Sequence, residues 1–231
     1  MRTIRIVQKR WNQEPGVGAA LASGCLIALL ILTACAPSPT VQFRFGETLL
    51  REDFSDTAAW ERYVNAEQRV AFEIVDNVFR ARAWDRGISW ALNETVHQDV
   101  VIEVETTQLS DYRDNAYGLM CRASPTNNGN GYYFLISGDG YAAIRRGAAD
   151  EITALVSWRK TSAVRQDRSI NRLRVVCLGN YLALYVNGEF VAETADSRYR
   201  TGYAGLSAAV TDGEVEVWFD DLTIWEALPV D

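Results

Sequence analysis

Alternation of apolar and polar residues from Thr48 onward is the feature that most constrains the fold of this chain. In one run, Val100, Ile102 and Val104 would all face the same side. Successive side chains of a strand point to opposite faces of a sheet, so this pattern indicates strands with one buried face. Turn residues interrupt it about every 8–12 positions, which is typical of an all-β sandwich or barrel. We expect about 13 strands and one short helical turn, at Asp56–Arg62.

Several turns are marked by residue pairs that tolerate a positive φ angle. Asn-Gly is the strongest short-range signal for a hairpin, because both residues adopt the left-handed conformation that a tight turn requires. The predicted hairpins are Ala71–Val75 with Val78–Trp84, Tyr132–Ile136 with Tyr141–Arg146, and a three-stranded meander of Arg172–Leu178, Tyr181–Val186 and Glu189–Thr194 that turns at Gly179-Asn180 and Asn187-Gly188.

The first 35 residues have the layout of an export signal. A basic opening precedes a long stretch without charge, between Glu14 and Arg44, and residues 17–34 are apolar or small. The stretch ends in Leu32-Thr33-Ala34-Cys35 and resembles a bacterial lipoprotein signal, which is cleaved before a Cys that receives the lipid. An uncleaved membrane anchor is the alternative, since about 20 apolar residues span a bilayer. Cys25 closes a second, weaker lipobox.

These features divide the chain into three parts. We expect a signal peptide at residues 1–34, the lipidated Cys35 and a flexible tether at residues 35–46, and one domain at residues 47–228. Pro37 and Pro39 suit a tether that lifts a domain off a membrane. The mature protein is therefore expected outside the cytoplasm, anchored by lipid to the outer face of the cell membrane.

Charge and histidine content exclude several classes of function. The net charge is −7, and removal of the basic signal makes it more negative, which argues against nucleic acid as a partner. His97 is the only histidine. A two-histidine metal site is therefore excluded, and a Ser-His-Asp triad has one candidate base. We expect His97 in a solvated loop between strands.

The alternation slips near the C-terminus. Val215, Val217 and Phe219 share one face. If the same alternation continued, Asp221 would be buried and Leu222 would be exposed. This slip predicts a β-bulge at Asp220-Asp221. The two carboxylates could bind a cation such as a structural calcium, or accept backbone N–H groups freed by the bulge. The second interpretation is favoured, and no cofactor is predicted.

Five segments occur in an order that resembles a known family. They are Leu50–Asp56 followed by Trp60, YYFLISGDGYAAIRR at residues 132–146, Asn171-Arg172-Leu173, LALYVNGEFV at residues 182–191, and Phe219–Leu222. Over residues 47–228 the chain resembles the concanavalin A-like jelly rolls, in particular their 3-keto-disaccharide hydrolase and laminin-G-like branches. The resemblance implies a jelly-roll β-sandwich of two antiparallel sheets.

The catalytic pattern of glucanases in that superfamily, Glu-x-Asp-x-x-Glu, is absent. The nearest approaches are Glu103/Glu105 and Glu214/Glu216, whose spacing puts each pair on one face of a strand. Both pairs lack a third acid and alternate with inward residues, so we expect them on the solvated surface. The sequence therefore predicts no catalytic residue.

Aromatic residues beside polar groups suggest a binding surface, because sugar-binding modules lay aromatic rings against pyranose faces and flank them with polar groups. The alternative for each residue is an ordinary place in the core or at an edge of the sandwich. The candidate ligand-binding residues are Trp84, Trp90, Tyr112, Arg122 and Tyr132.

Cys121 and Cys177 both alternate with apolar residues and should point inward. In an exported domain two inward cysteines favour a structural disulfide, and two buried free thiols are the alternative. A cysteine nucleophile is disfavoured, since an apolar setting raises the thiol pKa.

Together these observations predict a monomeric, membrane-anchored lipoprotein that binds a carbohydrate or glycan without cleaving it. A glycoside-processing enzyme of the 3-keto-disaccharide hydrolase type is the second hypothesis. A structural or protein-binding surface module is the third.

Overall fold

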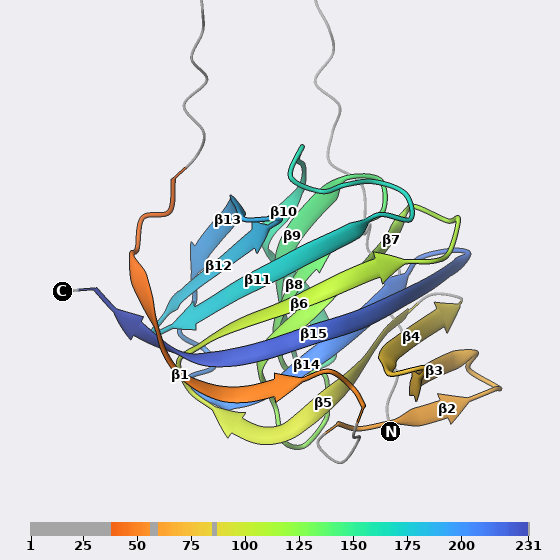
Figure 1. Cartoon of the computed structure of the whole chain (residues 1–231), viewed down its shortest axis with the longest axis horizontal. Coiled ribbons are helices and arrows are strands. Elements are labelled where there is room, and N and C mark those ends of the chain that lie inside the picture. The colour runs from red at the N-terminus through yellow and green to blue at the C-terminus, as the bar shows by residue number, and fades with distance from the viewer. Residues whose placement is uncertain (1–37, 56–59, 85–86, 231) are drawn as a thin grey trace, which may run out of the picture.

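The computed structural model describes residues 38–55, 60–84 and 87–230, and within these ranges the chain forms 15 strands and no helix. The strands form two antiparallel sheets that pack face to face (Figure 1). This arrangement is the predicted jelly-roll sandwich. In the described part of the chain, no helix is long and apolar enough to cross a membrane. Cys25, Cys35 and the predicted signal lie outside the described residues.

The larger sheet has nine strands. Its order is β13 (Glu189–Ala195), β12 (Tyr181–Val186), β11 (Ile170–Leu178), β6 (Val100–Gln108), β15 (Glu214–Pro229), β4 (Val78–Trp84), β3 (Val70–Val75) and β2 (Tyr63–Asn65), with β1 (Phe43–Glu52) also paired to β15.

The smaller sheet has six strands. Its order is β10 (Glu151–Lys160), β9 (Tyr141–Ala148), β8 (Gly131–Ile136), β7 (Asn115–Ala123), β14 (Gly202–Val210) and β5 (Gly87–His97). Both sheets are wholly antiparallel, as the resemblance implied.

The main core lies between the sheets and is built by the alternation that the sequence shows. Val104 on β6 and Phe134 on β8 are fully buried in it, together with Phe219 on β15. The aromatic rings of Phe54, Trp60 and Phe79 pack together at one end. Burial of these apolar side chains away from water provides the hydrophobic driving force for folding.

Strand β15 has different neighbours in its two halves. On one edge it pairs with β4 up to Phe219 and with β1 from Leu222 onward. The change coincides with the predicted bulge, because the register against β6 shifts by one residue between Asp220 and Thr223. Asp221 adopts a left-handed φ of 48°. The bulge returns Leu222 to the core, where it is fully buried.

The predicted hairpin turns are present. Asn187 and Gly188 both have positive φ angles between β12 and β13, and Asp76 and Asn77 do so between β3 and β4. Positive φ at both central residues is the geometry of the type I′ turn.

Some local expectations differ from the structure. His97 is the last residue of β5 and is 7% exposed, so it is not a solvated loop residue. Four residues of the expected helical turn, 56–59, lie outside the described residues, and Trp60 forms an isolated bridge with Asn93. Strand β1 begins at Phe43, four residues before the predicted domain boundary. The periodicity in the 40–50 region is weaker because register shifts interrupt β1.

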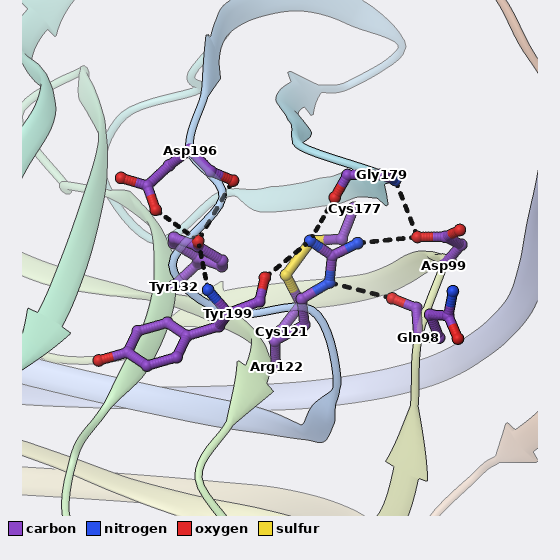
Figure 2. Close-up of a disulfide and its surroundings, with 9 residues drawn as sticks. All are labelled: Gln98, Asp99, Cys121, Arg122, Tyr132, Cys177, Gly179, Asp196 and Tyr199. Atoms are coloured by element: carbon purple, nitrogen blue, oxygen red, sulfur yellow. Dashed lines mark hydrogen bonds and ion pairs between the residues drawn. A yellow bond between two sulfur atoms is a disulfide. The ribbon is translucent and has the colours of Figure 1, made fainter.

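A disulfide joins the two sheets. Cys121 on β7 and Cys177 on β11 are bonded, with their Cα atoms 6.9 Å apart (Figure 2). Both cysteines are fully buried in the main core. The predicted disulfide is therefore confirmed.

Candidate glycan-binding face

The outer face of the six-stranded sheet carries a second hydrophobic cluster, separate from the core between the sheets. Tyr133 and Leu135 on β8 belong to it, while their neighbour Phe134 points inward. We call this set the outer-face cluster. Its buried members are Ile88, Trp90, Leu92, Ala116, Met120, Ala123, Tyr133, Leu135 and Ala209, and the partly buried Ile152, Trp158 and Tyr203 pack against them.

This face is unusual for an antiparallel sheet, whose outer side is commonly polar. Its central strands contribute both large and small side chains, such as Tyr133 on β8 and Ala116 on β7. A Cβ atom placed on Gly205 of β14 would lie 2.8 Å from Cδ2 of Leu92, so a larger residue there would displace the Leu92 side chain. Aromatic residues lie toward both edges, with Trp90 on β5 and Trp158 on β10. The buried members of the cluster are at most 4% exposed, so its apolar contact with solvent comes from the partly buried Ile152, Trp158 and Tyr203.

One corner of the outer-face cluster contains a chain of hydrogen bonds. Nε1 of Trp90 donates to Oδ1 of Asn127 at 2.5 Å, and Nδ2 of Asn127 donates to Oε1 of Glu61 at 2.7 Å. The backbone N–H of Leu92 donates to the second carboxylate oxygen of Glu61 at 3.1 Å. Burial raises the pKa of Glu61 despite these donors. The corner therefore holds an indole ring in a fixed position beside a carboxyl group with perturbed titration.

The opposite side of the face holds a cation. Cζ of Arg145 lies 5.4 Å from the centre of the Trp158 ring, a cation–π contact. Burial lowers the pKa of Arg145 to about 10. Arg145 is paired across the sheet with Tyr133 and shares its outward orientation. Five strand intervals separate β5 from β10, or about 24 Å at the usual spacing.

Only one of the five candidate binding residues, Trp90, belongs to the outer-face cluster. Trp84 lies at the end of β4 in the other sheet, where it packs against two arginines. Cζ of Arg82 is 4.2 Å and Cζ of Arg69 is 5.0 Å from the centre of its ring. The structure therefore does not bring Trp84 and Trp90 together.

Arg122 has a structural role at one end of the sandwich. It has a left-handed φ of 52°, and its fully buried guanidinium lies beside the disulfide (Figure 2). The guanidinium donates to the carbonyl oxygens of Gln98, Gly179 and Tyr199 and pairs with Asp99.

Tyr132 and Tyr112 also lie away from the outer-face cluster. Tyr132 points into the main core, and its hydroxyl donates to Oδ1 of Asp196 at 2.6 Å and accepts the backbone N–H of Tyr199 (Figure 2). Tyr112 is in the loop after β6 and packs against the main core, with its carbonyl accepting from Nδ2 of Asn115.

The two glutamate pairs considered for catalysis occupy the nine-stranded sheet. Glu103 bridges two arginines, with Oε1 3.0 Å from Arg172 and Oε2 2.6 Å from Arg174. Arg172 also contacts Glu105. Glu216 pairs with Arg82 at 2.9 Å. Glu103, Glu105 and Glu216 are thus engaged in ion pairs, which the alternation alone did not reveal. Glu103 is only 8% exposed, so the expected solvated surface position is wrong for this residue.

Of the two alternatives for the aspartates of the bulge, the structure shows a carboxylate that accepts a backbone N–H group. Oδ1 of Asp220 accepts the backbone N–H of Asp221 at 2.8 Å. Among the described residues, no group of three or more histidine, cysteine, aspartate or glutamate side chains is arranged to hold a metal ion.

Sequence reasoning missed Trp158, Arg145, Asn127 and Glu61. Register shifts on either side of Val156 disturb the alternation of β10, so the outward orientation of Trp158 cannot be read from its spacing. Glu61 and Asn127 come from loops that meet only in the folded chain.

A model of one protein family, described as the 3-keto-alpha-glucoside-1,2-lyase-like domain, matches residues 49–225. A search of curated proteins found no match.

Solved structures with a similar fold include the carbohydrate-binding module CBM66 of Bacillus subtilis, at 18% identity and a TM-score of 0.60 over 73% of this chain and 96% of that one. A Bacillus subtilis protein described as having a galectin-like fold is 11% identical, with a TM-score of 0.62 over 82% of this chain and 100% of that one. The GH16 protein of a Bacteroides ovatus mixed-linkage glucan locus, in complex with its G4G4G3G product, is 13% identical. Its TM-score is 0.54 over 76% of this chain and 99% of that one. At these identities the similarity shows a shared fold.

Proposed function

This chain belongs to the family of 3-keto-alpha-glucoside-1,2-lyase-like domains, and from that premise we propose that it binds a carbohydrate or glycan on the outer-face cluster without cleaving it. The observation that carries the proposal is the apolar and aromatic composition of the outer side of the six-stranded sheet, where Trp158 is partly exposed at one edge and Trp90 is 4% exposed at the other. The width of about 24 Å between those edge strands suits an oligosaccharide better than a single sugar. A carbohydrate-binding module among the structures of similar fold supports the same ligand class.

Two kinds of polar group would orient the sugar on this surface. The Trp90–Asn127–Glu61 chain offers amide and carboxylate groups at one corner. Arg145 supplies a cation beside Trp158 at the other. Sites for small ligands typically combine an apolar lining with a few directional polar groups.

The proposal includes export and anchoring. The sequence Leu32-Thr33-Ala34-Cys35 supports cleavage before Cys35 and its lipidation, which would hold the domain at the outer face of the cell membrane. Metabolic labelling with a fatty-acid analogue tests this step. Cys35→Ser should abolish both the label and membrane fractionation. Loss of both in Cys25→Ser, with Cys35→Ser unaffected, would assign the lipid to the other cysteine.

Binding is tested with the purified chain against a glycan array, followed by calorimetry on each hit. Trp90→Ala and Trp158→Ala should each weaken binding by about 1 kcal/mol or more, or roughly fivefold. Trp84→Ala is the matched control, because it removes an indole from the other sheet. Loss of affinity in Trp84→Ala alone would move the site to the nine-stranded sheet.

One observation favours the glycoside-processing alternative. Glu61 has a raised pKa and lies beside the outer-face cluster, and glycosidic chemistry uses a carboxyl group of this kind as general acid. Products are measured for every glycan that binds, in the native chain and in Glu61→Gln. Turnover that disappears in Glu61→Gln would replace the binding-module proposal with an enzyme.

A further inference from the structure

We infer that an aromatic patch on the outer face of the nine-stranded sheet contacts the lipid bilayer and fixes the orientation of the domain, an inference that rests on the proposed lipidation of Cys35. The membrane-side patch comprises Phe43, Phe45, Tyr185, Phe190 and Trp225. These residues come from β1, β12, β13 and β15, which meet at the end of the sheet where β1 begins (Figure 1).

The rings of the patch form one continuous cluster. The ring centres of Phe45 and Trp225 are 5.2 Å apart, those of Phe43 and Phe45 are 5.6 Å apart, and those of Tyr185 and Phe190 are 5.5 Å apart. Phe43 and Tyr185 connect the two groups at 6.2 Å. Phe45 is 45% exposed. Phe43, Phe190 and Trp225 are partly exposed, so four of the five rings offer apolar surface to a partner, while Tyr185 is buried.

The chain upstream of the patch identifies the partner. The backbone N–H of Thr40 donates to Oε2 of Glu193 at 2.9 Å, and Val41 packs against the patch. The chain is thus fastened to the sheet five residues after Cys35. Five residues span at most about 17 Å when fully extended. A lipid on Cys35 would therefore hold this end of the nine-stranded sheet within that distance of the bilayer surface.

The side chains suit the interfacial zone of a bilayer. Aromatic residues with an apolar body and a polar group accumulate at the membrane–water boundary. The hydroxyl of Tyr181, beside the patch, donates to Glu193 at 2.8 Å, so the region already combines apolar rings with a polar edge. Charges of both signs border the patch, with Arg44 and Glu226 both exposed. We therefore expect contact through apolar insertion, with little dependence on salt or on anionic lipid.

This orientation has a consequence for the proposed ligand. The patch and the outer-face cluster lie on the outer sides of opposite sheets, with the main core between them. A domain that rests on the patch would direct the outer-face cluster away from the bilayer, toward ligands outside the cell.

The test uses the full lipidated chain in phosphatidylcholine vesicles that contain phospholipid spin-labelled near the headgroup. A single cysteine at Phe45→Cys carries a small aromatic fluorophore, which replaces one exposed ring by another. Cys121 and Cys177 are oxidised and do not react. Two matched controls carry the same label. Val64→Cys, at a residue 64% exposed on β2, reports the far edge of the same sheet, and Ala154→Cys, at an exposed residue on β10, reports the other sheet.

We expect the label at Phe45→Cys to lose fluorescence to the spin-labelled lipid and both control labels to keep theirs, at low and high salt alike. Equal quenching at Phe45→Cys and Ala154→Cys would overturn the orientation. No quenching at Phe45→Cys in a chain that sediments with the vesicles would overturn it while leaving the anchoring intact. Failure of the chain to sediment would overturn the anchoring and this inference with it, but not the proposed glycan binding.

Discussion

Arg122 and Asp99 form an ion pair next to the inter-sheet disulfide, with Nη2 of the arginine 2.8 Å from Oδ1 of the aspartate. The arginine side chain is 1% exposed and the aspartate side chain 28%. Asp99 Oδ1 also accepts the backbone N–H of Gly179 at 2.8 Å. The pair therefore connects the end of β7 to the turns before β6 and after β11.

Arg122→Met should lower the free energy of unfolding by about 3 kcal/mol, because loss of one partner leaves a partly buried charge and several carbonyl groups without their donors. Chemical denaturation measures the change. Arg168→Met is the control, since Arg168 pairs with Asp111 where the two side chains are 64% and 90% exposed. That exposed pair should contribute at most about 0.5 kcal/mol. Equal losses in the two variants would contradict a structural role for Arg122.

Reduction of the disulfide should destabilise the domain by about 2–4 kcal/mol, if the cross-link acts by restricting the unfolded chain. The loop it closes is long, since the two cysteines are 56 residues apart. Denaturation with and without reductant measures the effect, and the Cys121→Ser, Cys177→Ser double variant should match the reduced protein. Thiol titration of the denatured, unreduced domain should find neither cysteine free. Two reactive thiols would refute the disulfide.

His97 should make the protein less stable in mild acid. Burial lowers its pKa below the usual 6.5, so the folded state binds fewer protons than the unfolded state between these two values. The stability that this group contributes is present above pH 6.5 and is lost as the pH falls through the folded pKa. The unfolding free energy of the native chain minus that of His97→Gln should therefore be more positive at about pH 7.5 than at about pH 5.

His97 is the only histidine. The other groups that titrate, Glu61 among them, are present in both proteins, so their effects cancel in the comparison. A difference that does not change with pH would mean that His97 keeps its ordinary pKa in the folded state.

Glu103→Gln should cost about 1 kcal/mol of unfolding free energy, because its partly screened carboxylate bridges Arg172 and Arg174. A double-mutant cycle with Arg174→Met isolates the interaction between Glu103 and Arg174. The double variant should lose less unfolding free energy than the sum of the losses in the two single variants. Glycan binding should be unchanged in Glu103→Gln. Loss of turnover of any glycan in this variant would instead make Glu103 part of a catalytic site.

The fold could be predicted because it depends on local patterns. The alternation and the Asn-Gly turn specify strand faces and hairpins, and the slip at Asp220-Asp221 correctly indicated a bulge. Those signals involve residues that are neighbours in the sequence. The inward orientation of the two cysteines was likewise sufficient to predict the disulfide.

The candidate site could be predicted only in part, because its residues are brought together by pairing across the sheet. Trp90 was identified by its aromatic character, whereas its partner Asn127 comes from a loop 37 residues away. Alternation places Arg122 on the opposite face of β7 from the inward Cys121, but its left-handed backbone turns the guanidinium into the end of the sandwich. A pattern of alternation carries no information about either event.

The disulfide has a mechanical consequence. It joins β7, a strand of the six-stranded sheet, to β11, a strand of the nine-stranded sheet. If a ligand held on the first sheet is pulled while a lipid on Cys35 holds the second, the tension must cross from one layer to the other. The Cys121–Cys177 bond provides a covalent route for that load, so the two layers cannot be peeled apart by separating their side chains alone. An oxidised domain should therefore resist a pulling force that separates the layers of a reduced one, even where the two bind a ligand equally well at rest.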